Sequence, residues 1–171
     1  MLKKIKRLMI MCMWPTYVQS GAHLHAISVM FKSFFFQRVL RINSHVPWPV
    51  HPTSQLKGVE NIKRGNRTPG LGLNCYIDGR NGIIFGDNVL VGPKVSIISM
   101  NHDLNERNRY IEDDPIRIGD DSWLATGCII LSGVTLGKNT VVAAGSVVTK
   151  SFPSGNQVIA GNPAKVIKVL E

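Results

Sequence analysis

His102 is the side chain best suited to proton transfer in the C-terminal part of the chain, because every other histidine lies at or before residue 51. A neutral imidazole can remove a proton from a hydroxyl group and return it to a leaving group. Asp103 follows directly and could orient the ring or stabilise its cation. Adjacent side chains seldom face each other in an extended chain, so Asp103 could equally be solvated while a backbone carbonyl orients the ring. A lone histidine in a polar stretch is also compatible with an ordinary exposed position.

A repeat of six residues indicates the elements that hold this histidine. A small residue usually follows each apolar member of the repeat, and a compact side chain comes four residues after it. The same spacing appears earlier at Phe85, Val91 and Ile97. The apolar positions are Ile118, Leu124, Ile130, Leu136, Val142 and Val148, and the compact positions are Ser122, Cys128, Val134, Thr140 and Ser146.

A period of six does not suit an amphipathic helix. Six residues advance an α-helix by roughly 600°, which scatters the apolar positions over three faces. In an extended chain the side chains alternate, so an even spacing keeps all of them on one side. The repeat therefore predicts short strands separated by corners and stacked as the coils of a parallel β-helix.

The repeat is interrupted between Ile97 and Ile118, which lie 21 residues apart. Three repeats use roughly 18 residues, so we expect a short excursion of about three residues beyond the repeat. It contains Asn101, His102 and Asp103 and continues as a charged run to Asp114. A polar loop on a rigid scaffold is a natural place for a site.

The chain resembles the hexapeptide-repeat acyltransferases over residues 50–171. The stretches IGDDSW, LATGCI, LGKNTV and VAAGSV fit that family's repeat, whereas Leu131 departs from it. Further similarity lies in NGIIFGDNVLVGPKVSIISMNHD and in the closing AGNPAKVI. The resemblance implies an all-β left-handed parallel β-helix with an N-terminal helical segment, assembled as a homotrimer. It also implies transfer of acetyl from acetyl-CoA to a hydroxyl of a sugar, polysaccharide or lipid-linked saccharide.

The resemblance assigns roles to residues that carry the acyl transfer. His102 matches the family's catalytic histidine and is expected to act as general base. Asn74 matches an asparagine near the acceptor and the reacting carbonyl, where an amide could hold a substrate hydroxyl or stabilise an oxyanion. An ordinary corner asparagine is the alternative for Asn74. Asp103 is a candidate for substrate binding.

The resemblance also implies contacts to acetyl-CoA, a long polyanion. The residues concerned are Thr126 and Ala144 along the pantetheine, Thr149 and Lys150 near the adenosine end, and Lys165 and Lys168 at the phosphates. The family usually has arginine at the last two places, and lysine lacks the bidentate geometry of arginine. Both lysines could instead be solvated residues of the C-terminal tail.

The positive charge of the chain belongs to its N-terminal part. The formal net charge is +9, and residues 1–59 contain eight of the twenty Lys and Arg residues but none of the eleven Asp and Glu residues. Residues 1–14 are basic and then apolar, with an apolar run too short to favour a signal peptide. We expect a cytoplasmic protein, with the inner face of the cell membrane as one location.

The pattern divides the chain into an N-terminal helical segment, residues 1–45, and a repeat domain, residues 46–171, with a short C-terminal tail. Within the first part, residues 23–43 are predicted to be helical. Their phenylalanines either cap the open end of the β-helix, or contact another subunit, or lie on an anionic membrane. A Pro-rich stretch, residues 45–52, ends this helix.

Other functions are less well supported. A γ-type carbonic anhydrase needs three histidines on zinc, and the repeat domain has His51 and His102 alone. No metal is therefore expected, and the three cysteines show no pairing or metal-binding spacing. The basic run contains no nucleic-acid-binding motif. A serine acetyltransferase or other small-molecule acetyltransferase, and a non-catalytic hexapeptide scaffold, remain as alternatives.

Overall fold

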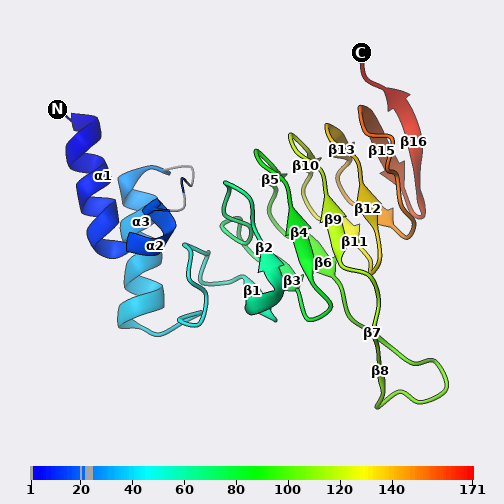
Figure 1. Cartoon of the computed structure of the whole chain (residues 1–171), viewed down its shortest axis with the longest axis horizontal. Coiled ribbons are helices and arrows are strands. Elements are labelled where there is room, and N and C mark those ends of the chain that lie inside the picture. The colour runs from blue at the N-terminus through cyan, green and yellow to red at the C-terminus, as the bar shows by residue number, and fades with distance from the viewer. Residues whose placement is uncertain (1, 20, 22–24) are drawn as a thin grey trace.

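The computed structural model describes residues 2–19, 21 and 25–171. Helices at the N-terminal end lead into a stack of coils that runs along the long axis of the molecule (Figure 1). One hairpin leaves the side of this stack, and the C-terminal strands cover its far end. The mostly β architecture of parallel stacked coils, with a short helical segment before it, confirms the fold predicted from the repeat.

Three parallel sheets form the sides of the coil, named here faces A, B and C. Face A consists of β1 (Gln55–Lys57), β3 (Tyr76–Asp78), β6 (Ser96–Ile98), β11 (Ile129–Ile130) and β14 (Val147–Val148). Face B consists of β2 (Ile62–Lys63), β4 (Ile83–Phe85), β9 (Ile116–Ile118) and β12 (Thr135–Leu136). Face C consists of β5 (Leu90–Val91), β10 (Trp123–Leu124), β13 (Thr140–Val142) and β15 (Gln157–Gly161), with β16 (Ala164–Val169) added antiparallel to β15.

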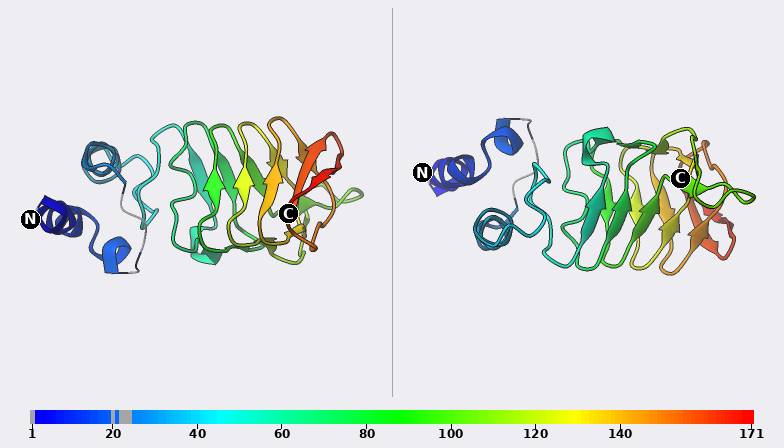
Figure 2. Two further views of the ribbon diagram at one scale, coloured as in Figure 1. Left: turned by 90° about the horizontal axis from the view of Figure 1, so that it is seen from above. Right: turned by 90° about the horizontal axis from the view of Figure 1, so that it is seen from below.

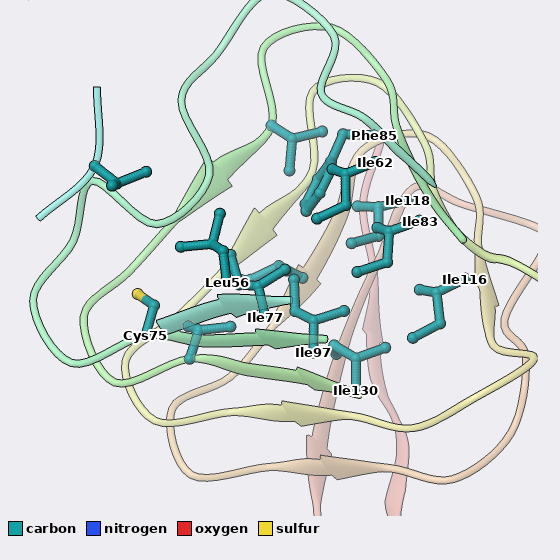
Figure 3. Close-up of a cluster of buried hydrophobic side chains, with 14 of the residues drawn as sticks. Leu56, Ile62, Cys75, Ile77, Ile83, Phe85, Ile97, Ile116, Ile118 and Ile130 are labelled. Carbon is teal, nitrogen blue, oxygen red and sulfur yellow. The ribbon is translucent and has the colours of Figure 1, made fainter. Parts of the chain in front are cut away.

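Each repeat of six residues makes one side of the coil, and three repeats make one turn. Leu124 therefore pairs with Val142 on face C, and Ile130 pairs with Val148 on face A. The apolar side chains of faces A and B point inward (Figure 3), and Leu124 and Val142 of face C belong to the same buried core. Each of these side chains is buried against the coil before and the coil after, which is the main source of stability in a solenoid.

Small residues next to the corners are required by the spacing between coils. A Cβ atom on Gly119 would collide with the backbone of Lys138 in the next coil. On Gly137 it would collide with the backbone of Pro153 and Gly155. The repeat position after each apolar residue is therefore small because a neighbouring backbone occupies the space.

Asparagine and aspartate build the corner between faces B and C, which we call edge BC. Asn88, Asp121 and Asn139 have φ values of 57°, 58° and 54°, a region that Asn and Asp tolerate better than other side chains. Their side chains also bond between coils: Asn88 Nδ2 donates to Asp121 Oδ1 at 3.2 Å, and Asn139 Nδ2 donates to Asn156 Oδ1 at 3.0 Å. The corners are thus held both by backbone conformation and by bonds along the axis.

The interruption after Ile97 is longer than the repeat count suggested. Phe85 pairs with Ile118 on face B, so the chain passes from face A at Ile97 to face B at Ile118 in a single step. One step of six leaves fifteen of the 21 residues as the excursion, and the expected excursion of three residues is wrong. The extra residues form the hairpin of β7 (Asn101–His102) and β8 (Tyr110–Ile111). Residues inserted in multiples of six leave the phase of the repeat unchanged. The spacing of the apolar residues therefore cannot distinguish an excursion of three residues from one of fifteen.

The helices lie against the N-terminal end of the coil (Figure 2). They are α1 (Leu2–Met13), α2 (Pro15–Gln19), α3 (Ile27–Phe34) and the π-helical turn η1 (Phe35–Val39), and a 3-10 turn η2 (Val59–Asn61) lies between β1 and β2. Buried Gln37 joins them to the next stretch, since its amide donates to the carbonyl of Trp48 at 3.1 Å and accepts from the Val50 amide at 2.9 Å. Trp48 in turn donates to the carbonyl of Pro69 at 3.0 Å.

The helix predicted at residues 23–43 is shorter in the structure. It begins at Ile27 and its last π-helical turn ends at Val39, while residues 22–24 lie outside the described residues. Arg41 and Asn43 have φ values of 62° and 57°, which end the helical conformation. Among the described residues, no helix has both the length and the apolar character needed to cross a bilayer.

The close approach of the coils leads to a stability prediction. Gly119→Ala places a methyl group against the backbone of Lys138, so we expect the free energy of unfolding to fall by about 1–3 kcal/mol. Gly127→Asn is the control, because Gly127 has a φ of 70° and open space where a Cβ would lie. Asparagine accepts this φ less well than glycine does but meets no neighbouring atom, so we expect this variant to lose less than about 1 kcal/mol. Denaturant unfolding at fixed protein concentration compares them, and equal losses would contradict the packing account.

Candidate active site

His102 projects from the hairpin with one ring nitrogen engaged. Its Nδ1 lies 2.5 Å from the carbonyl oxygen of Arg107. A carbonyl can only accept a hydrogen bond, so Nδ1 carries a proton, and in the neutral ring Nε2 keeps its lone pair. The side chain is exposed and lines a cleft with Asp103, Leu104 and Arg107. This arrangement presents a free basic nitrogen at the surface of the hairpin.

The ring of Tyr110 packs against the imidazole ring of His102. The centroid of the Tyr110 ring lies 4.7 Å from that of His102, at an interplanar angle of 42°. The guanidinium of Arg80 lies 4.9 Å from the centre of the same tyrosine ring. Arg80 donates to buried Asp78 from Nη2 at 2.7 Å and from Nε at 2.9 Å. The histidine is therefore connected to face A through two stacked groups and an ion pair.

Asp78 and Arg80 each stabilise the charged form of the other. Burial by itself would raise the pKa of Asp78, but the hydrogen bonds and charge of Arg80 outweigh it and hold that pKa below its ordinary value. The bond to Asp78 raises the pKa of Arg80 in turn. Sequence reasoning missed Tyr110, Arg80 and Asp78, because none of them belongs to the apolar repeat and the stack forms only when the hairpin folds back.

Asp103 shapes the hairpin and does not orient the histidine. Its Oδ1 accepts from the backbone amides of Asn105 at 2.8 Å and Glu106 at 3.2 Å, which closes the turn. Its Oδ2 lies 3.9 Å from Nε of Arg109. Of the two candidates considered from the sequence, the backbone carbonyl of Arg107 orients the ring.

A second connection fixes the base of the hairpin on the coil. Asn101 Nδ2 donates to Ser132 Oγ at 2.7 Å, and Ser132 Oγ donates to Asp113 Oδ2 at 2.7 Å. Ser132 belongs to the turn between β11 and β12, one coil further on. The hairpin is thus held at two places. Asp78 on face A holds it through Arg80, and Ser132 in the next coil holds it through Asn101 and Asp113.

The residues expected to contact acetyl-CoA occupy two different corners of the coil. Edge AB, between faces A and B, includes residues 79–82, 99–115, 131–134 and 149–151. It carries His102, Asp103, Thr149 and Lys150, and the last two are exposed directly after β14. The basic nitrogen and the expected adenosine contacts therefore share one edge.

Edge CA, between faces C and A, includes residues 72–74, 92–95, 125–128 and 143–146. It carries Asn74, Thr126 and Ala144. Asn74 is exposed with a φ of 54°, and its backbone amide donates to Thr53 Oγ1 at 2.9 Å. The amide of Gly145 donates to the carbonyl of Thr126 at 3.0 Å, which stacks the two corners. Lys165 pairs with Ala160 at the end of β15, whereas Lys168 lies further along β16, and both lysines are exposed.

Edge CA also offers room for a narrow ligand. Gly127 and Gly145 follow Thr126 and Ala144, and no heavy atom lies within 4 Å of the place where their Cβ atoms would be. By contrast, a Cβ atom on Gly133 of edge AB would lie 3.0 Å from the carboxylate of Asp113. The backbone of edge CA is therefore not covered by neighbouring side chains at Gly127 and Gly145.

The structure separates the two sets of predicted residues by the width of face A. Edge AB holds the base, and edge CA holds Asn74 with the expected pantetheine contacts. Within the described residues, no cluster of three or more His, Cys, Asp or Glu side chains could hold a metal ion. The buried thiol of Cys128 is one of the compact corner groups, and burial raises its pKa to about 12.

Comparison with known proteins places this chain among related sequences. Residues 115–150 match the family described as Bacterial transferase hexapeptide (six repeats), and residues 71–97 match Hexapeptide repeat of succinyl-transferase. A solved structure described as galactoside acetyltransferase in complex with coenzyme A superimposes with a TM-score of 0.67 at 26% identity, covering 98% of this chain and 82% of that one. The repeat domain of this chain is thus similar to the hexapeptide-repeat acyltransferases.

Curated relatives of this hexapeptide-repeat protein include two enzymes named galactoside O-acetyltransferase. The Escherichia coli enzyme is 39% identical over 89 residues, which are 50% of this chain and 43% of that protein. The Lactococcus lactis enzyme is 40% identical over 88 residues, which are 49% of this chain and 42% of that protein. The matched region is thus less than half the length of these relatives.

The ion pair beneath Tyr110 leads to a pH prediction. The pKa of Asp78 is lowered by folding, so its contribution to stability is present above its unfolded value, about pH 4, and is lost as the pH falls through the folded value. We expect Asp78→Asn to cost about 1–3 kcal/mol at neutral pH. Urea unfolding should also show a weaker decline of stability on acidification than in the wild type. Asp114→Asn, at an exposed position, is the control, and matching acid profiles of Asp78→Asn and the wild type would contradict the assignment.

Proposed function

We propose that the protein transfers an acetyl group from acetyl-CoA to a hydroxyl group of a saccharide, with His102 as general base. The main support is the single engaged nitrogen of this ring, because the bond from Nδ1 to the Arg107 carbonyl leaves Nε2 as the acceptor for a substrate proton. The names of the relatives, galactoside O-acetyltransferase, support the acceptor class. The solved neighbour in complex with coenzyme A supports the donor.

In the proposed reaction, Nε2 of His102 takes the proton of the acceptor hydroxyl while the hydroxyl oxygen forms a bond to the thioester carbonyl carbon. Backbone amides, with the side chain of Asn74, stabilise the negative charge on the carbonyl oxygen. The bond from carbon to sulfur then breaks, and the imidazolium returns the proton to the departing thiolate. The products are an acetyl ester and free CoA, and no acetylated enzyme forms. The stack of Tyr110 and Arg80 against His102 keeps the ring in one orientation throughout.

The donor is proposed to lie along edge CA and to reach edge AB of another subunit. Thr126 and Ala144 border the open backbone at Gly127 and Gly145, which suits the pantetheine arm. Lys150, Lys165 and Lys168 are exposed cations that suit the phosphates of the donor. Since His102 lies on the opposite side of face A, the base and the pantetheine groove meet when edge AB of one protomer faces edge CA of a partner. A closed ring of three protomers forms three such sites.

The proposed base is tested by substitution. We expect His102→Ala to lower the turnover number by about 10²–10⁴-fold, the usual contribution of a general base, with little change in acetyl-CoA affinity. Asn108→Ala, an exposed position of the same hairpin, is the matched control. Release of CoA thiol in the presence of a panel of saccharides, with serine included, reports turnover and separates the two acceptor classes. Full activity of His102→Ala, or a burst of acetylated enzyme before turnover, would rule out this mechanism.

The proposed donor contact is tested by calorimetric titration of acetyl-CoA. We expect Lys150→Ala to weaken binding by roughly five- to thirtyfold, because an exposed charge on a phosphate contributes about 1–2 kcal/mol. Lys138→Ala removes a similar exposed charge on edge BC and should bind as the wild type does. The absence of binding to folded wild-type protein would favour a non-catalytic scaffold.

A further inference from the structure

The first helix has two apolar sides, and the fold covers one of them. Ile10 and Trp14 are buried in the contact with α3, where the edge of the Trp14 ring faces Phe34 at 6.4 Å between centroids. Residues separated by three or four positions share one side of a helix. Ile5, Leu8 and Met9 have this spacing, yet they are 50%, 63% and 51% exposed.

The third helix has an exposed apolar stripe of its own. Phe31, Phe35 and Val39 follow one another at intervals of four, through α3 and η1, and lie along one stripe. They are 62%, 43% and 58% exposed. We call Ile5, Leu8, Met9, Phe31, Phe35 and Val39 the exposed apolar surface. Six large apolar side chains in 39 residues exceed the scattered single residues of an ordinary surface.

The charge around this surface has one sign. Lys4, Arg7 and Lys32 are exposed on the same helices, and the sequence has no Asp or Glu before Glu60. A second copy of the same helices would bring these cations against one another, and docking of that kind is opposed by like-charge repulsion. An anionic surface is attracted instead, because exposed apolar residues next to lysine and arginine are typical of helices that lie in a lipid headgroup layer.

The position of the helices leaves such a surface accessible. They stand at one end of the long axis, with α1 outermost, and the C-terminal strands stand at the other end (Figures 1 and 2). A planar partner at this end would leave the faces and edges of the coil uncovered. The site residues of edges AB and CA would therefore remain open to substrate.

We propose that the N-terminal helices dock the protein onto an anionic lipid membrane, with the exposed apolar surface in the headgroup layer and the basic side chains at the lipid phosphates. One side of α1 stays packed on α3, so the helix lies on the membrane by its outer side. This inference does not depend on the proposed reaction, since it rests on residues outside both edges.

The test is sedimentation of the full chain with vesicles. We expect binding to vesicles of phosphatidylglycerol mixed with phosphatidylcholine, weak binding to pure phosphatidylcholine, and release at high salt. The triple variant Ile5→Gln, Leu8→Gln, Met9→Gln should lower the partition coefficient by more than about tenfold. The double variant Lys4→Gln, Arg7→Gln should lower it by about twenty-fivefold on anionic vesicles, because each basic side chain contributes roughly fivefold.

Two control variants remove similar side chains elsewhere in the molecule, one pair at the C-terminal end and one pair on the coil. Ile167→Gln with Val169→Gln removes exposed apolar groups from β16, and Arg117→Gln with Lys138→Gln removes two exposed charges from the coil. Both should bind vesicles as the wild type does. Failure of the wild type to bind anionic vesicles, or equal binding by the triple variant, would overturn the proposal. A smaller assembly of the triple variant in sedimentation velocity, without vesicle binding by the wild type, would assign the surface to a second copy and would also overturn it.

Discussion

The constraint on which the structure depends is the close stacking of one coil on the next. Each inward apolar side chain is buried only because a neighbouring coil lies above and below it, so every coil needs its neighbours. This spacing excludes a Cβ atom at Gly119 and Gly137 and leaves the corners to residues that accept a positive φ, such as Asn88 and Asn139. It also requires the ends to be covered, and the N-terminal helices and the antiparallel strand β16 lie at those ends.

The same constraint determines where chemistry can be placed. Side chains that point inward are used by the core, so functional groups lie at the corners or on segments that leave the coil. The hairpin that carries His102 leaves at edge AB, and it is held there by Asp78 on one side and Ser132 on the other. Edge CA remains smooth and open at Gly127 and Gly145. The three-edged scaffold therefore places His102 and the uncovered backbone at Gly127 and Gly145 on different edges, and the proposed reaction needs a second protomer to bring them together.

The regular part of this fold could be predicted from sequence because its cause is local. Residues such as Leu124, Val142 and Val148 recur at six, and the pairing at eighteen residues follows from the number of sides. The length of the excursion could not be predicted, since insertions in multiples of six preserve the phase. The stack of His102, Tyr110 and Arg80 depends on how the hairpin folds back over face A, and no spacing in the sequence encodes that contact. The role of Asp103 likewise depended on the shape of the turn that it closes.

The proposed sharing of one site between two protomers is tested most directly with mixed subunits. His102→Ala removes the base on edge AB, and Ala144→Trp fills the groove on edge CA at an exposed position where the fold should tolerate it. Each variant alone should be nearly inactive. Co-expressed in equal amounts, they should regain about a quarter of the wild-type CoA release, because one in four random pairs of neighbours combines two intact edges. No regained activity in mixed assemblies of normal size would contradict a site shared between protomers.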